Sequence, residues 1–164
     1  ERVPMRAART VVVLTCAALT GCLPTVDEPR CGPSHGVVAH VIDGDTLELE
    51  SGERVRLLLV DTPESTTHVE CFGAEAAAFH RAQVQGRTVQ LSYDAECTDR
   101  FGRLLAFVQV GGQSVNQALV AQGYACVLHI PPNGESVVDL YRELETRAID
   151  ERRGLWSACV DAPC

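Results

Sequence analysis

The first clear pattern along the chain is a series of short segments rich in β-branched and apolar residues. Three of them follow one another, at 37–42, 46–50 and 54–60, and the second alternates between apolar and polar residues. An Asp-Gly pair at 43–44 and a Ser-Gly pair at 51–52 separate them, and such pairs are typical of tight hairpin turns. The pattern therefore predicts a meander of three antiparallel strands.

Helical periodicity and further strands follow. An Ala-rich segment at 75–85 predicts a helix, and two more strand patterns cover 89–93 and 104–110. Apolar residues then recur at helical spacing over 115–122 and 137–148. This order, with one helix between the third and fourth strands, predicts an α+β fold: a small five-stranded OB-type β-barrel with about three packed helices.

The N-terminal segment has the pattern of an export signal. A basic stretch at 5–9 precedes an apolar run at 10–19, and small residues follow it. The sequence Leu-Thr-Gly-Cys at 19–22 resembles a bacterial lipobox, in which Cys22 would carry a lipid and become the first mature residue. A plain signal peptide cleaved nearby and a short buried strand are the alternatives. The lipobox predicts an exported bacterial protein, lipid-anchored to the cell envelope at the outer membrane, or secreted.

The chain accordingly divides into four parts. A signal peptide with its lipobox is expected at 1–21, and a tether rich in Pro and polar residues at 22–35. The folded domain is expected at 36–159, with a short C-terminal tail at 160–164. No internal repeat or oligomerisation pattern is evident, so we expect one domain and a monomer.

Cysteine usage agrees with export. Six cysteines lie beyond the export segment: Cys31, Cys71, Cys97, Cys126, Cys159 and Cys164. In an exported domain they predict disulfides, and none of them has the spacing of a zinc site. Among the possible pairings we expect Cys71 with Cys97, because both flank segments that carry candidate site residues.

The net charge, taken alone, argues against a nucleic-acid substrate. The chain carries 14 basic residues, all of them arginine, against 22 acidic residues, for a formal charge of −8. Phosphate neutralisation by a basic surface usually supplies most of the affinity for nucleic acid. Binding must then depend on a few well-placed arginines and a metal ion.

Two acidic clusters lie where a three-strand meander would bring them together. Asp43 and Asp45 lie in the first hairpin turn, whereas Asp61 and Glu64 follow the apolar third strand. Each cluster by itself is explained as a turn or a solvated loop. In the meander, however, Asp45 and Asp61 would converge beside Glu64, where three carboxylates would repel one another without a cation. Oxygen ligands favour Ca²⁺ or Mg²⁺ over zinc or copper.

Two arginines are placed to face these carboxylates. Arg56 lies in the third strand, and Arg103 ends the segment 98–103 between the fourth and fifth strands. A guanidinium group can hold two phosphate oxygens at once, although a surface ion pair is the alternative for each arginine. Carboxylates with a metal ion, a further Glu and two arginines together indicate phosphodiester cleavage.

Three blocks of sequence, taken together, resemble the staphylococcal nuclease family. They are Ile42-Asp43-Gly44-Asp45-Thr46, then Arg56-Leu57-Leu58-Leu59-Val60-Asp61-Thr62-Pro63-Glu64, then Thr98-Asp99-Arg100-Phe101-Gly102-Arg103. The stretches at 71–76, 115–123 and 154–156 are similar as well. The blocks occur in the family's order with similar spacing, and the resemblance extends from about 36 to 159.

The resemblance implies a calcium-dependent endonuclease that hydrolyses DNA and RNA to products with 3′-phosphate ends. It implies that the carboxylates of Asp45 and Asp61 hold Ca²⁺, together with the backbone carbonyl of Thr62. Asp43 would lie just outside and orient a water or a ligand.

Further roles follow from the same resemblance. Glu64 would act as the general base or position the attacking water. Arg56 and Arg103 would bind the scissile phosphate, with Arg103 near the departing 5′-oxygen. Arg100 and His129 are the candidate substrate-binding residues.

The chain also departs from the family. His129 and Pro131 stand where the family presents two tyrosines to the substrate, and a partly buried strand histidine is the alternative for His129. The loop 65–70 is shorter than in the type enzyme of the family and lacks the lysines of that loop. With the acidic surface, these departures predict weaker substrate binding, a higher KM or a different preferred substrate length, with the chemistry intact.

Two other functions compete with the nuclease. One is a non-catalytic OB-type envelope lipoprotein that binds a ligand, and the other is a structural envelope lipoprotein. A degenerate binding module would be expected to lose the carboxylates, the Glu or the arginines. This chain retains all of them, which favours the nuclease.

Overall fold

The computed structural model describes residues 31–163. The predicted signal peptide, the predicted lipidation site Cys22 and most of the predicted tether lie outside these residues. Within the described range, no helix combines the length and apolar character needed to cross a membrane.

The elements follow the predicted order. The strands are β1 (His35–Val41), β2 (Thr46–Leu49), β3 (Arg54–Leu57), β4 (Thr88–Ser92), β5 (Leu104–Val110) and β6 (Gln113–Ser114). The helices are α1 (Gly73–Val84), α2 (Val115–Ala121), α3 (Val138–Asp150) and α4 (Leu155–Ala158). As predicted, α1 lies between the third and fourth strands.

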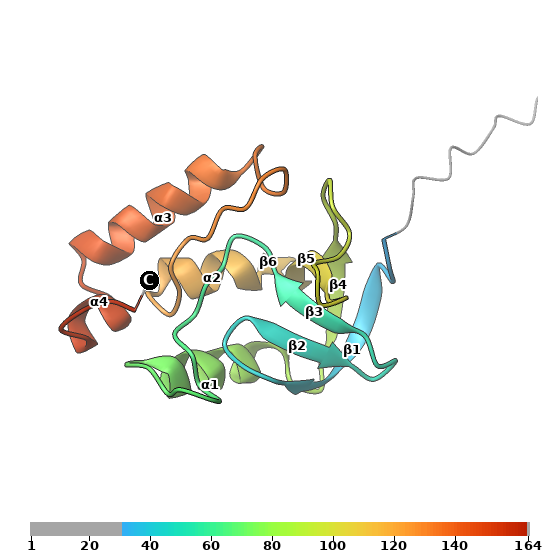
Figure 1. Ribbon diagram of the computed structural model, residues 1–164, viewed down its shortest axis with the longest axis horizontal. Coiled ribbons are helices and arrows are strands. Elements are labelled where there is room, and N and C mark those ends of the chain that lie inside the picture. Colours follow the sequence, from blue (N-terminus) through green and yellow to red (C-terminus); the bar gives the residue numbers. More distant parts are fainter. Residues whose placement is uncertain (1–30, 164) are drawn as a thin grey trace, which may run out of the picture.

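Strands β1 to β5 close into a barrel. β1 pairs antiparallel with both β2 and β4, while β2 also pairs with β3 and β4 with β5. Parallel pairing of β3 with β5 closes the barrel and places Arg56 opposite Leu105. The predicted α+β fold, an OB-type barrel with packed helices, is confirmed (Figure 1).

The core fills the barrel and continues under the helices. Every second residue of β5, from Leu104 to Val110, is buried, because alternate side chains of a strand point to opposite faces. Helix α2 lies between α1 and α3 and contacts both (Figure 1). The helices thus cover one side of the barrel with their apolar faces.

Asn116, at the start of α2, ties this helix to the barrel. Its side chain is fully buried, accepts a hydrogen bond from Val108 N (2.8 Å) and donates one to Leu58 O (2.9 Å). Buried backbone groups need such partners where the strand ladder does not supply them. The amide therefore holds the chain just beyond β3, which leads directly to the acidic segment.

The end of the third strand and two short elements differ from the sequence prediction. The third strand ends at Leu57 rather than at residue 60, since the chain turns at Leu59, which has a left-handed backbone (φ 60°). All of 57–60 remain buried, so apolar composition alone could not separate a strand from a buried turn. β6 and α4 were not predicted, because they are too short to show a period.

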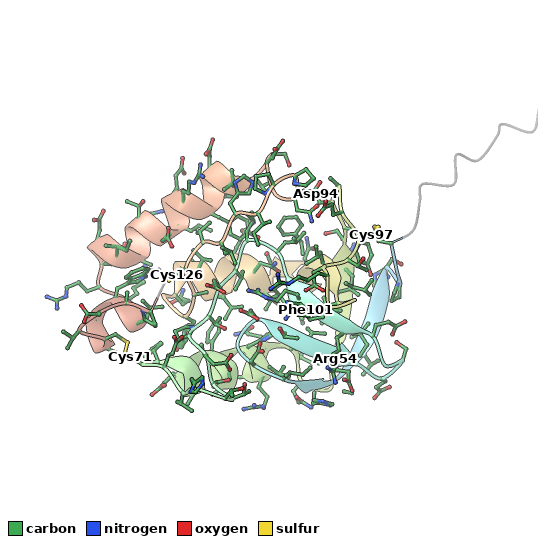
Figure 2. All side chains as sticks on the ribbon, viewed as in Figure 1. Arg54, Cys71, Asp94, Cys97, Phe101 and Cys126 are labelled. Atoms are coloured by element: carbon green, nitrogen blue, oxygen red, sulfur yellow. A yellow bond between two sulfur atoms is a disulfide. The ribbon has the colours of Figure 1, made fainter. Side chains whose placement is uncertain are left out.

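The predicted Cys71–Cys97 disulfide is wrong. Cys97 pairs instead with Cys31, and Cys71 pairs with Cys159, while Cys126 is also disulfide-bonded. Figure 2 shows Cys71 and Cys97 on opposite sides of the molecule. Flanking a site segment in sequence does not bring two cysteines together, because tertiary packing decides which ends of those segments meet.

Removing the Cys31–Cys97 disulfide should lower the free energy of unfolding by about 4 kcal/mol. The bond has a sequence separation of 66, and in the chain-entropy account such a loop restrains the unfolded state by roughly that amount. Urea unfolding of the chain and of Cys31→Ser/Cys97→Ser measures the loss. The pair Cys71→Ser/Cys159→Ser, with a separation of 88, should lose a comparable amount. Losses below about 1 kcal/mol for both would contradict this account.

Candidate functional site

The turn between β1 and β2 buries a carboxylate. The backbone N–H of Asp45 donates to Asp43 Oδ1 (3.0 Å), which is the usual local bond of an Asp turn. The Asp45 side chain in turn accepts from the Thr46 hydroxyl (3.0 Å) and from the backbone N–H of Thr62 (3.2 Å). The first acidic turn is therefore bonded to Thr62, in the segment that carries Asp61 and Glu64.

Gly44 permits this contact. A Cβ atom at this position would lie 2.4 Å from the hydroxyl oxygen of Thr62, which is far inside van der Waals contact. The Asp-Gly-Asp turn needs its central glycine because the chain carrying Thr62 packs directly against it. Gly44 thus lets the Thr62 side chain approach the backbone of the turn, in addition to favouring the turn itself.

Arg56 lies at the centre of the acidic residues. Its Nη2 atom is 3.1 Å from Asp45 Oδ2 and 3.1 Å from Asp61 Oδ1. Its Nη1 atom donates to the backbone carbonyls of Leu57 and Val60, and the side chain is only 14% exposed. Asp45 and Asp61 therefore converge as predicted, with the guanidinium group as their shared cation.

Positive charge is nevertheless short at this site. Burial and the neighbouring Asp45 raise the pKa of Asp43 to about 6. Burial also raises the pKa of Asp61, although Arg56 partly opposes the shift. Both shifts have the direction expected where carboxylates outnumber the cations that face them. A divalent cation would supply the missing charge.

The available donors fit Ca²⁺ better than a softer metal. Asp45 and Asp61 offer carboxylate oxygens beside the Thr62 backbone, and Ca²⁺ accepts such oxygens in flexible numbers. No group of three His, Cys, Asp or Glu side chains meets as a metal-binding cluster within residues 31–163. A bound ion would therefore take its remaining ligands from a backbone carbonyl and from water.

Glu64, predicted to lie beside Asp45 and Asp61, bonds to the loop that follows it. Its Oε1 accepts bonds from Ser65 N (2.9 Å), Thr66 N (2.8 Å) and the Thr66 hydroxyl (2.6 Å). The bonds from Thr66 above all lower the pKa of Glu64. The carboxylate is thus ionised at neutral pH and held through one oxygen, which leaves Oε2 as the oxygen able to take a proton.

Asp99 shapes the loop that carries Arg103. Its Oδ1 accepts the backbone N–H groups of Phe101 (2.9 Å) and Arg103 (3.0 Å), and its Oδ2 pairs with the Arg103 guanidinium at 2.7 Å. Burial alone would raise the pKa of Asp99, but these bonds from Arg103 and Phe101 lower it overall. Arg103 also reaches Thr46, which bonds Asp45, so the third sequence block is joined to the first.

A cavity of about 550 Å³ opens beside the two arginines. It is lined by Arg56, Arg103, Arg100 and Phe101, and by apolar side chains from the end of β3 and from 128–130. Arg100, a predicted substrate-binding residue, thus belongs to the cavity wall. The arrangement offers cationic donors at one wall and an apolar surface at another, as a site for a phosphate bearing a flat organic group would.

His129 is not among the residues that line this cavity. Its neighbours Leu128 and Ile130 line it instead, while the His129 Nε2 atom is buried. In an extended chain alternate side chains face opposite ways, so one residue of register decides which of them meet the cavity. The sequence analysis did not identify Leu128 and Ile130 as cavity residues. Only the alternation of apolar residues at 128–130 could have indicated them.

The fold and the site together define a class of protein. It is an α+β OB-type barrel that carries paired carboxylates, two arginines and a cavity at one end. Residues 54–158, more than half of the chain, match the family model described as staphylococcal nuclease homologue. The chain belongs to the staphylococcal nuclease family.

Several relatives are about 35% identical to the chain over the matched region. The thermonuclease of Staphylococcus intermedius is 35% identical over 126 residues, which cover 73% of this chain and 74% of that protein. Endonuclease YncB of Bacillus subtilis is 35% identical over 71% of the chain, and an uncharacterised Bacillus anthracis protein is 35% identical over 74%. The matched region spans 58% of YncB and 60% of the anthracis protein.

His80 is a site neighbour that the sequence did not reveal. It lies on the buried face of α1 with Ala76, Ala77 and Val84, and its Nδ1 is 3.2 Å from the carbonyl oxygen of Asp43. A carbonyl only accepts, so Nδ1 carries the proton and donates. Burial lowers the pKa of His80 to about 4, and the imidazole therefore stays neutral while it supports the Asp43 turn.

His80 should make the chain less stable as the pH falls from about 6.5 to 4. In this window the unfolded chain protonates His80 and the folded chain does not, so the free energy of unfolding decreases by up to about 3 kcal/mol. Urea unfolding at several pH values measures the slope. His80→Gln should flatten it, whereas His40→Gln, at an exposed strand position, should keep it. Equal slopes for the chain and His80→Gln would contradict the assignment.

Proposed function

We propose that the protein is a calcium-dependent endonuclease that hydrolyses phosphodiester bonds of DNA and RNA and leaves 3′-phosphate ends. The main support is the joint placement of Arg56 and Arg103 on the wall of one cavity, beside the Asp45–Asp61 pair. Arg56 and Arg103 lie far apart in the sequence, and the fold brings both to the wall of one cavity. The thermonuclease and endonuclease names of the relatives support the same activity.

The two arginines would hold the scissile phosphate. Arg103 is oriented by Asp99 and remains partly exposed to the cavity, so it can add a phosphate oxygen to its existing pair. Arg56 donates to two carbonyls and two carboxylates, which keeps its guanidinium group in one position. A preorganised guanidinium stabilises negative charge that builds on the phosphate in the transition state without reorganising.

Glu64 would activate the attacking water. Its Oε1 is fixed by three donors of the following loop, so Oε2 is the oxygen that would take the proton. A lowered pKa makes it a weaker base but keeps it ionised at neutral pH, ready to accept. The short loop 65–70 thus positions the base.

A calcium ion would be held by Asp45, Asp61 and the Thr62 carbonyl. When bound, it would neutralise charge on the phosphate and help to orient the water. The neighbouring carboxylates Asp45 and Glu70, which add to the burial that raises the pKa values of Asp43 and Asp61, support a site that would gain from a cation.

We also propose that the protein acts outside the cytoplasm, as a lipid-anchored or secreted enzyme. The disulfides of the described domain support this, because such bonds persist in oxidising compartments. The lipobox at Cys22 would supply the anchor. Mass spectrometry of the protein from membranes, with and without Cys22→Ser, tests the lipid.

Replacing Glu64 with Gln should reduce kcat by about 10²- to 10⁴-fold, since the amide cannot take a proton but retains the shape. The assay is cleavage of single-stranded DNA and RNA with Ca²⁺, with Mg²⁺ and with EDTA. Glu143→Gln, on the exposed face of α3, is the matched control and should cleave normally. Full activity in Glu64→Gln would show that Glu64 is not the general base. Absence of cleavage by the folded, disulfide-intact chain would favour the ligand-binding lipoprotein.

Calcium should stabilise the folded chain. With a Kd on the order of 10⁻⁴–10⁻³ M, as for other extracellular sites, about 10 mM Ca²⁺ should raise the free energy of unfolding by about 1.4–2.7 kcal/mol. Asp61→Asn and Asp45→Asn should abolish the gain, whereas Asp139→Asn, on α3, should retain it. Urea unfolding with Ca²⁺ or EDTA measures this without any nuclease assay. An equal gain in Asp61→Asn and in the unaltered chain would show that the ion binds elsewhere.

A further inference from the structure

His80 is a fully buried side chain to which the proposed reaction gives no role. The other buried residues on its face of α1 are small or apolar: Gly73, Ala76, Ala77 and Val84. Its Nδ1 donates to the carbonyl oxygen of Asp43 at 3.2 Å, whereas its Nε2 is buried and has no hydrogen-bond partner among residues 31–163. A buried polar atom without a partner opposes folding. Packing of the core therefore does not explain a histidine at this position, and the bond to Asp43 is its distinguishing contact.

Another side chain joins α1 to the barrel by hydrogen bonds. The helix packs beside β1 (Figure 1). Gln85, directly after the helix, accepts a hydrogen bond from Val41 N (3.1 Å) and donates one to the carbonyl oxygen of Ala39. The helix is therefore bonded to β1 without His80. The bond from His80 reaches beyond the strand, to the turn that carries Asp43.

The start of α1 lies against the segment that holds Glu64. A Cβ atom on Gly73 would lie 2.2 Å from the carbonyl oxygen of Glu64, and the Gly73 N–H donates to the carbonyl of Glu70 (3.1 Å). Gly73 and His80 stand about two helical turns apart, which is roughly 10 Å along the axis. One helix therefore contacts both the acidic turn with Asp45 and the segment with the proposed base. Its length sets the spacing between these two parts of the site.

We propose that His80 is a positioning residue that holds the Asp43–Asp45 turn in the geometry needed to bind Ca²⁺. It touches neither the cation nor the phosphate and acts through the carbonyl of Asp43. The Asp45 N–H bonds Asp43 Oδ1 at 3.0 Å, so the position of Asp43 is passed directly to Asp45, whose carboxylate would hold the ion. Hydrogen-bond partners behind metal ligands commonly change metal affinity or activity by about 10- to 100-fold. The proposal rests on the proposed nuclease function, because it concerns the cation site of that reaction.

His80→Leu and His80→Asn test the hydrogen bond. Leucine has a similar size and no donor, whereas asparagine places an amide N–H close to the position of Nδ1. The Kd for Ca²⁺ follows from the free energy of unfolding measured in urea over a series of Ca²⁺ concentrations. His80→Leu should raise this Kd by about 10-fold, at the lower end of the usual range because His80 acts through Asp43. His80→Asn should restore it to within about threefold, and His80→Met, a second variant without a donor, should match His80→Leu.

Gln85→Ala is the matched control. It removes both hydrogen bonds between the end of α1 and β1 but leaves the donor to Asp43 in place. It should lower the free energy of unfolding and leave the Kd for Ca²⁺ unchanged. If Gln85→Ala weakens Ca²⁺ binding as much as His80→Leu does, the loss comes from looser docking of the helix, and the positioning role is overturned.

The tautomer of His80 provides a test that needs neither Ca²⁺ nor substrate. The ¹⁵N chemical shifts of its ring should show a proton on Nδ1 and none on Nε2, because the Asp43 carbonyl can only accept. A ring with its proton on Nε2 alone could not donate to Asp43 and would overturn the proposal.

Calcium affinity and cleavage together separate this proposal from the nuclease function. With Ca²⁺ below the Kd of the unaltered chain, His80→Leu should lower kcat by about 10-fold and leave KM for DNA unchanged, since Arg56 and Arg103 are untouched. If the chain cleaves and His80→Leu matches it in Kd and kcat, the positioning role is overturned and the nuclease stands. If the chain binds Ca²⁺ but cleaves nothing, a raised Kd in His80→Leu still supports the positioning role, and an equal Kd overturns it. A chain that binds no Ca²⁺ overturns it as well.

Discussion

The parallel pairing of β3 with β5 is the constraint on which the site depends. It closes the barrel, and its register sets Arg56 opposite Leu105, two residues after Arg103. Two arginines from distant parts of the sequence are thereby brought to the wall of the same cavity. Closure of a barrel fixes strand register strongly, since a slip would turn every buried side chain outward. The same pairing that protects the core therefore holds Arg56 and Arg103 in place at the cavity.

Electrostatics at the end of the barrel combine a structural and a chemical requirement. Arg56 joins Asp45, Asp61 and the carbonyls beyond β3, so its charge is used to hold the polypeptide together. Burial raises the pKa values of Asp43 and Asp61, and the neighbouring carboxylates Asp45 and Glu70 add to the two shifts. The proposed cation site and the proposed phosphate site therefore lie side by side in an acidic protein, because Arg56 and Arg103 reach the same cavity wall.

The disulfides anchor the segments that carry the site. Cys97 directly precedes the loop with Arg103, and Cys71 follows the loop that holds Glu64. Cys126 forms a two-hydrogen-bond bridge with the backbone of Asp61, at 3.0 and 2.8 Å, and is itself disulfide-bonded. Loops are normally the most mobile parts of a small domain. Tying each functional loop to a distant element reduces that mobility where positions matter most.

Local patterns in the sequence were sufficient to predict the strands, the first helices and the barrel. They also predicted the meeting of Asp45 with Asp61, because short-range periodicity and turn residues determine a meander of hairpins. The tertiary structure alone decided the partner of Cys97, the orientation of Glu64 into its own loop and the exposure of Leu128 to the cavity in place of His129. Each of these depends on how distant segments pack or on one residue of register. Such choices are made by burial and closure of the whole barrel, and no short stretch of sequence contains that information.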